Sequence, residues 1–166
     1  MDPLIQFMQL QFTIERLISD YVHCIDDDRL EEWPGFFADP CVYKITSAEN
    51  YERGLPIGVF FANSRGMLQD RVTALREANI YEPQRYRHLV SSTRILGQID
   101  STVRVESNFM VARIMQSGAT TLFATGRYLD RIALDRIATD EPRPLFVEKI
   151  VVCDSRRIDT LLAIPL

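Results

Sequence analysis

Four long runs rich in β-branched and aromatic residues fill the second half of the chain and constrain its fold most strongly. They cover residues 86–97, 101–116, 120–134 and 145–155. Turn-forming residues separate them, at Gly97/Asp100, Ser117-Gly118 and Asp140-Glu141-Pro142. Long strands joined by short turns pair most readily with their neighbours in sequence, so these runs predict an antiparallel meander.

The beginning of the chain carries helical signals instead. Asp2-Pro3 is a suitable helix start, because Asp caps free N–H groups and proline fits the first helical position. The run Asp26-Asp27-Asp28 is expected to end this helix. One apolar stripe at helical spacing predicts the buried face: Phe7, Leu10, Ile14, Leu17, Ile18, Tyr21 and Ile25.

Shorter elements are predicted between this helix and the meander. Cys41–Thr46 has the pattern of a strand, a loop containing Asn50 and Gly54 follows, and residues 57–61 form a short apolar segment. Ser64 can cap a helix to about Asn79. Its expected inner face consists of Met67, Leu68, Val72 and Leu75. Residues 160–166 are too apolar for a free tail, so we expect them to pack against another part of the chain. The order of elements predicts one α+β domain over residues 1–166, with helices on one face of a curved antiparallel sheet.

Composition limits the function classes. The 166 residues are 46% hydrophobic and 25% charged, which fits one globular domain. A net charge of −4 argues against nucleic-acid binding, which needs a basic face. No signal-peptide pattern or membrane-spanning run is present in the sequence. Three scattered cysteines without a CxxC pair indicate buried thiols in a reducing compartment, so we expect a cytoplasmic protein.

The inventory of metal ligands is too small for redox chemistry. A Rieske cluster needs two Cys and two His, and the chain has no Cys-x-His or Cys-x-x-His spacing. A mononuclear iron site would have to use His23 and His88, but His23 falls opposite the apolar stripe of the first helix. We therefore expect neither metal nor cofactor in this chain, and no catalytic residue. His88 is interpreted as a structural histidine bonded to backbone or a carboxylate, with acid–base and interface roles as alternatives.

A second apolar strip lies on the first helix. Ile5, Met8 and Phe12 fall on the side away from the core stripe. Exposed apolar area of this kind is unfavourable unless something covers it. A partner protein would cover it, or else loops or the C-terminal segment of the same chain.

Residues 70–95 resemble the small (β) subunits of aromatic-ring-hydroxylating dioxygenases. An Asp-Arg and Leu-Arg helix, an acidic-Pro turn, an Arg-x-Arg-His strand and a final Arg-Ile pair carry the resemblance. The matching residues are Asp70, Arg71, Leu75, Arg76, Glu82, Pro83, Arg85, Arg87, His88, Arg94 and Ile95. Further matches are Tyr21, Asp27, Trp33, Phe36, Phe37, Tyr43 and Cys153-Asp154-Ser155. The likeness spans nearly the whole chain and is nearest to the terephthalate, salicylate and anthranilate-type branch. One departure is Ser92, where many members have Asn.

The resemblance implies the cone-shaped NTF2-like fold, which nuclear transport factor 2 and scytalone dehydratase share. It also implies a large α subunit that holds the Rieske [2Fe-2S] cluster and the mononuclear iron, commonly in an α3β3 assembly. The small subunit would then be structural, in an oxygenase acting on an aromatic carboxylic acid. Its substrate, and whether it mono- or dihydroxylates, would be set mainly in the α subunit.

Charged residues of the matching motif suit a scaffold or contact surface. Asp70, Arg71, Arg76, Arg87 and His88 can form ion pairs and bidentate hydrogen bonds within the subunit or across to its partner. With Ile5, Phe12 and Asp154, they are the structural or interface candidates.

An independent dehydratase, an isomerase or a ligand-binding protein on the same fold is the alternative. Such an enzyme would use Tyr21, Tyr43, His88 and Asp154 in an open cone. A cone plugged by aromatic side chains would argue against it.

Overall fold

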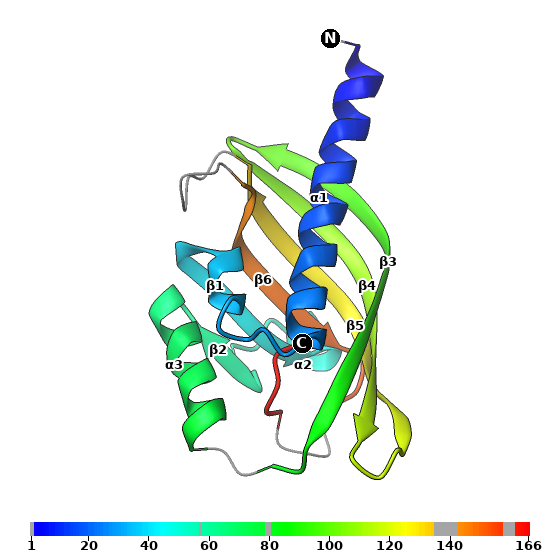
Figure 1. Cartoon of the computed structure of the whole chain (residues 1–166). Helices are drawn as coiled ribbons and strands as arrows, with labels where there is room; N and C mark the ends of the chain where they lie inside the picture. Colours follow the sequence, from blue (N-terminus) through cyan, green and yellow to red (C-terminus); the bar gives the residue numbers. More distant parts are fainter. Residues whose placement is uncertain (1, 57, 79–80, 135–142, 158–161) are drawn as a thin grey trace.

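The computed structural model describes residues 2–56, 58–78, 81–134, 143–157 and 162–166. Its elements follow in chain order as α1 (Pro3–Asp26), η1 (Trp33–Phe36), β1 (Phe37–Ser47), α2 (Ala48–Glu52), β2 (Phe60–Ala62), α3 (Arg65–Glu77), β3 (Gln84–Ile99), β4 (Thr102–Met115), β5 (Thr120–Ala133) and β6 (Leu145–Cys153). The sheet curves around α1, which crosses its concave face (Figure 1). This is the predicted α+β arrangement.

Six strands form one sheet in the order β2-β1-β6-β5-β4-β3. The four later strands pair antiparallel with their sequence neighbours, so the predicted meander is confirmed. Strand β1 joins the meander by a parallel pairing with β6. That pairing could not be predicted from local sequence patterns, because it joins residues 37–47 to residues 146–153.

The first helix is capped as predicted, since the Asp2 side chain accepts a hydrogen bond from the Leu4 N–H at 2.8 Å. It ends at Asp26. Its C-terminal half buries Ile14, Leu17, Ile18, Tyr21, Val22, Cys24 and Ile25. The prediction was wrong for Phe7, which is 54% exposed. The first turns of α1 project past the edge of the sheet, where no core exists to receive that side chain (Figure 1).

The third helix also starts where the sequence indicates. Ser64 accepts from the Met67 N–H at 3.2 Å, and Leu68, Val72 and Leu75 are buried. Met67 is 40% exposed and not on the inner face, because it lies at the solvent-facing start of the helix.

Other boundaries differ from the prediction in detail. Strand β1 begins at Phe37, four residues before the predicted start, and residues 48–52 form the short helix α2 where a loop was expected. The predicted turn at residues 140–142 and the positions 57, 79, 160 and 161 lie outside the described residues.

Aromatic side chains fill the interior of the cone. Tyr21 meets Phe37 and Phe146 edge-on, with ring centroids 6.2 and 5.3 Å apart, and Trp33 meets Tyr43 at 5.2 Å. Edge-to-face contacts of this kind stabilise the core by more than the burial of their apolar area alone. Residues 162–166 are buried against the cone as well, as predicted for that part of the tail.

Candidate functional site

A buried ion pair lies within the aromatic interior. Lys149 on β6 is directly opposite Asp130 on β5, and its Nζ lies 3.1 and 3.2 Å from the two carboxylate oxygens. Both side chains are fully buried. The same ammonium lies 3.6 Å from the centroid of the Tyr128 ring and 4.5 Å from that of Phe146. The carboxylate and the ring faces replace the water that the ammonium loses.

Burial dominates the ionisation of this pair. It raises the pKa of Asp130 to about 6, although the neighbouring ammonium opposes the shift. The same burial lowers the pKa of Lys149, with Asp130 acting in the other direction. A pair of this kind is sensitive to the loss of one partner, because the remaining charge has no water to solvate it.

The tail is held against the core by hydrogen bonds to Tyr21, Tyr43 and Arg71. The hydroxyl groups of Tyr21 and Tyr43 donate to the Leu166 carbonyl at 2.8 and 3.0 Å, and the Leu166 N–H donates to Tyr43 at 3.2 Å. Burial raises the pKa of both phenols, so both remain protonated donors. Arg71 on α3 donates to the carbonyls of Leu162 and Ala163.

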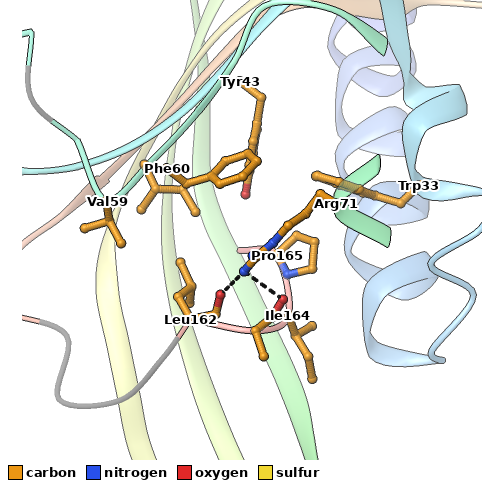
Figure 2. A pocket seen from close by; sticks show the side chains of 10 residues that line it. Trp33, Tyr43, Val59, Phe60, Arg71, Leu162, Ile164 and Pro165 are labelled. Atoms are coloured by element: carbon orange, nitrogen blue, oxygen red, sulfur yellow. Dashed lines mark hydrogen bonds between the residues drawn. The ribbon is translucent and has the colours of Figure 1, made fainter. Parts of the chain in front are cut away.

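A cavity of about 120 Å³ remains between the tail, η1 and strands β1 and β2 (Figure 2). Its lining consists of Trp33, Tyr43, Ile45, Val59, Phe60, Arg71 and residues 162–165. The Arg71 guanidinium lies 5.3 Å from the centroid of the Phe60 ring. The cavity is therefore mainly apolar, with one cation in its wall.

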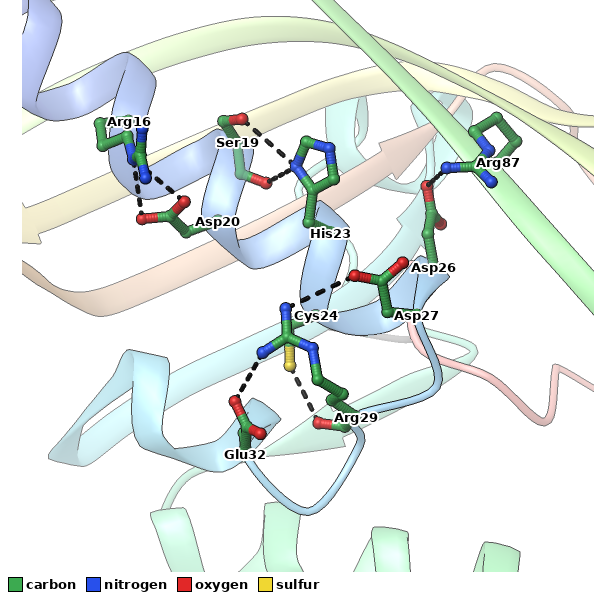
Figure 3. A network of polar contacts seen from close by, with 10 residues as sticks. All are labelled: Arg16, Ser19, Asp20, His23, Cys24, Asp26, Asp27, Arg29, Glu32 and Arg87. Carbon is green, nitrogen blue, oxygen red and sulfur yellow. Dashed lines mark hydrogen bonds and ion pairs between the residues drawn. The ribbon is translucent and has the colours of Figure 1, made fainter.

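His88 and Asp26 join the end of α1 to strand β3. Nδ1 of His88 lies 2.6 Å from Oδ1 of Asp26, and the His88 backbone N–H donates to Oδ2 at 2.9 Å. Both side chains are buried. Arg87 is mostly exposed and reaches Asp26 at only 4.0 Å (Figure 3). The histidine bonded to a carboxylate is thus a structural junction between helix and sheet.

Arg76 joins α3 to the segment that follows α1. Its guanidinium contacts Glu31 at 2.7 Å and Asp28 at 3.0 Å, and it also donates to the Asp28 carbonyl at 2.9 Å. The predicted bidentate pairing of Arg76 is therefore made within the subunit. Asp70 is exposed on the same helix, and Asp154 accepts from the Thr125 hydroxyl at 2.8 Å at the surface.

The projecting turns of α1 expose a large apolar surface. Its residues are Leu4, Ile5, Phe7, Met8 and Phe12, each between 49% and 68% exposed. We call these five residues the α1 strip. The strip contains the predicted Ile5, Met8 and Phe12, and Leu4 extends it. Phe7 lies on the other side of the helix, so the projecting turns are apolar on more than one side.

The described part of the chain contains no cluster of side chains that could bind a metal ion. No group of three or more His, Cys, Asp or Glu side chains there is placed to hold an ion. His23 is exposed on α1 and contacts Ser19 (Figure 3), whereas His88 is buried against Asp26. Cys24, Cys41 and Cys153 are buried free thiols, each with a pKa raised by burial to about 11. These residues do not fit a Rieske cluster or a mononuclear iron. No helix among the described residues is long and apolar enough to span a membrane.

The four residues of the alternative enzyme do not form one constellation. Tyr21 and Tyr43 meet at Leu166 and His88 bonds to Asp26, whereas Asp154 is exposed in the bend that follows β6. The residues that sequence reasoning missed are Lys149 and Asp130. Strand alternation contained the signal, since Lys149 shares its face with Val151 and Cys153, and Asp130 shares its face with Tyr128 and Ile132.

A curved sheet wrapped around α1, with an interior filled by aromatic rings, an ion pair and the tail, defines an NTF2-like α+β protein. The sequence profile described as the ring-hydroxylating β subunit matches residues 22–159. The chain therefore belongs to the ring-hydroxylating β-subunit family.

Relatives and solved structures agree with this assignment. The chain is 42% identical over 146 residues to subunit β1 of the terminal oxygenase component of terephthalate 1,2-dioxygenase from Comamonas sp., covering 88% of this chain and 92% of the relative. It is 37% identical to the anthranilate 1,2-dioxygenase small subunit of Burkholderia cepacia, over the full length of both. The crystal structure of a protein described as an aromatic-ring-hydroxylating dioxygenase β subunit, from Novosphingobium aromaticivorans, superposes with a TM-score of 0.83. That comparison has 34% identity and covers 95% and 96% of the two chains. The predicted family and NTF2-like fold are confirmed.

Proposed function

We propose that this chain is the non-catalytic assembly subunit of a terminal oxygenase that acts on an aromatic carboxylic acid. A large subunit would hold the Rieske [2Fe-2S] cluster and the mononuclear iron, in an α3β3 complex in the cytoplasm. The substrate class follows the names of two relatives, which are subunits of terephthalate and anthranilate dioxygenases. The whole chain, residues 1–166, would act as one domain.

The single observation that carries the non-catalytic role is the filling of the cone. The position where an NTF2-like enzyme would hold its substrate is occupied by Lys149, Asp130 and the aromatic rings around them. The buried tail packs beside this filled interior, with Leu166 fixed by two tyrosine hydroxyls. Little space remains there for a reaction, which supports a role through surfaces.

The α1 strip is the surface that we assign to the large subunit. Five large apolar side chains on three helical turns form more exposed apolar surface than an isolated protein normally keeps. Interfaces concentrate their binding energy in a few such anchors, with aromatic residues prominent among them. Ile5 and Phe12 would be anchors of this contact.

The charged residues would support the contact indirectly. Arg76 and His88 hold the loop after α1 and the end of α1 itself, so they fix the direction in which the helix projects. Asp70, Arg71, Arg87 and Asp154 complete the set of scaffold or contact candidates.

Co-expression with a large subunit of the same organism tests the proposal. We expect one complex that contains both chains, with all iron bound to the large subunit. Phe12→Asp should weaken the complex, since a buried aspartate at an interface lacks a partner. Gln9→Asp is the matched control, because Gln9 is an exposed neighbour on the same helix and is not in the α1 strip. Equal loss of complex in both variants, or normal assembly of Phe12→Asp, would contradict the role of the strip.

A further inference from the structure

The cavity behind the tail combines aromatic walls with one guanidinium. Trp33, Tyr43 and Phe60 line it on the side of η1, β1 and β2, and Arg71 reaches it from α3 (Figure 2). Elements far apart in sequence therefore build its wall. Such a mixture of apolar lining and a few polar groups is typical of small-molecule sites.

Arg71 has unused hydrogen-bonding capacity. Among the described residues, the hydrogen bonds of Arg71 all come from Nη2 and go to the carbonyls of the tail. A guanidinium carries five N–H donors in a planar fork that matches a carboxylate. The cation thus favours an anionic group with two coplanar oxygens.

Trp33 forms one of the aromatic walls of the cavity. It is fully buried, and its ring lies 5.2 Å from that of Tyr43, with an interplanar angle of 82°. Two buried aromatic rings therefore meet at the cavity wall and offer a surface against which a flat apolar ligand can pack.

The volume limits the size of the ligand. A cavity of about 120 Å³ is comparable with the roughly 150 Å³ that holds one benzene ring in a protein interior. One six-membered ring is therefore the size that we expect the cavity to hold, beside the contacting rings of Phe60 and Tyr43, and a fused pair of rings exceeds the space.

We propose that this cavity is a binding site for a single-ring aromatic carboxylate, with the ring among Trp33, Tyr43 and Phe60 and the carboxylate on Arg71. This site lies in the small subunit itself, apart from any oxygenation site in the large subunit. A bound ligand would contact residues 162–165 and so stabilise the closed tail. The inference concerns this chain alone, so it can fail while the assembly role holds, and the reverse.

Fluorescence of Trp33 offers a direct test, because it is the sole tryptophan of the chain. Titration of the full chain with benzoate, excited at a wavelength that benzoate does not absorb, should change the emission and reach saturation. A ligand of this size is expected to bind with a dissociation constant of about 1 mM or below. Benzamide has the same shape without the charge and should bind at least about tenfold more weakly.

Three variants separate the parts of the site. Arg71→Met should weaken benzoate binding at least about tenfold, and Arg71→Lys, which keeps the charge but loses the planar fork, should bind with an intermediate affinity. Val59→Phe fills the cavity and keeps both the guanidinium and the tail, so it should abolish binding even if Arg71→Met unfolds. 2-Naphthoate should not bind to the wild-type chain.

The proposal is overturned by any of three results. One is the absence of a saturable emission change with benzoate up to about 20 mM, well above the expected constant. Another is equal affinity for benzoate and benzamide. The third is undiminished benzoate binding by folded Val59→Phe, which would place the ligand elsewhere.

Discussion

Replacing Lys149 with methionine should reveal how strongly the filled cone depends on its buried ion pair. The substitution keeps most of the side-chain volume but leaves the Asp130 carboxylate without its partner, in a position where both side chains are fully buried. Breaking a buried pair in this way costs about 3–5 kcal/mol, a large part of the 5–15 kcal/mol that stabilises an ordinary domain. The contacts of the ammonium with the rings of Tyr128 and Phe146 are lost as well. We therefore expect the loss of unfolding free energy to lie near the upper end of this 3–5 kcal/mol range, at about 5 kcal/mol.

Urea unfolding followed by circular dichroism measures this loss. With a slope of about 2 kcal/mol per molar urea, the midpoint should fall by about 1.5–2.5 M at pH 8. The double variant Lys149→Met/Asp130→Leu is the control. It should recover most of the midpoint, because an apolar pair of similar volume leaves no buried charge.

The pH dependence gives the sign of the effect. Burial already raises the pKa of Asp130 to about 6 in the presence of Lys149, and loss of the ammonium raises it further. A carboxyl whose folded pKa is raised destabilises the fold above that pKa, and the penalty is relieved as the pH falls through it. The deficit of Lys149→Met should therefore shrink between pH 8 and pH 5. A loss below about 1 kcal/mol at pH 8, or an unchanged deficit at pH 5, would refute the reasoning.

Three further predictions concern the surface and the sheet. Arg76→Ala should lower the unfolding free energy by about 1.5 kcal/mol in urea titration, whereas Arg87→Ala, whose contact is long and exposed, should cost less than about 0.5 kcal/mol. Equal losses of unfolding free energy in the two variants would show that the Arg76 contacts do not stabilise the fold. Ser92 has a φ of 55° at a bulge of β3, so Ser92→Asn should raise the thermal midpoint by a few degrees, corresponding to about 0.5 kcal/mol; a lower midpoint would contradict this. Hydrogen bonds from Arg94 and Arg127 lower the pKa of Glu106, so its stabilisation is present above the unfolded pKa and is lost as the pH falls through the folded one. Glu106→Gln should therefore be less sensitive than wild type between pH 5 and pH 3 in the same titration, and parallel curves would argue against the pairing.

The local parts of the fold could be predicted because short segments of sequence encode them. Asp2 and Ser64 cap the helices that they were expected to cap, and the four later strands fall where β-branched residues concentrate. The position of Ser92 is a related case. Asparagine tolerates the left-handed backbone that the bulge requires, and serine adopts it less readily.

Long-range features could not be predicted in the same way. The pairing of Lys149 with Asp130 depends on the register between two strands, and the parallel contact of β1 with β6 joins segments about 100 residues apart. The position of Arg71 depends on where the tail returns to the cone. Phe7 was misassigned because periodicity shows which face of a helix is apolar, and the extent of the sheet decides how much of that face is covered.

The central claim is that this chain assembles with a large oxygenase subunit and carries no redox centre of its own. Co-purification of the tagged chain with that subunit, followed by native mass and iron analysis of the complex and of each separated chain, tests it most directly. We expect the purified complex to have the mass of an α3β3 assembly, with iron in the large subunit and none in the small one. A small subunit that remains alone while the large subunit is fully active without it would contradict the account.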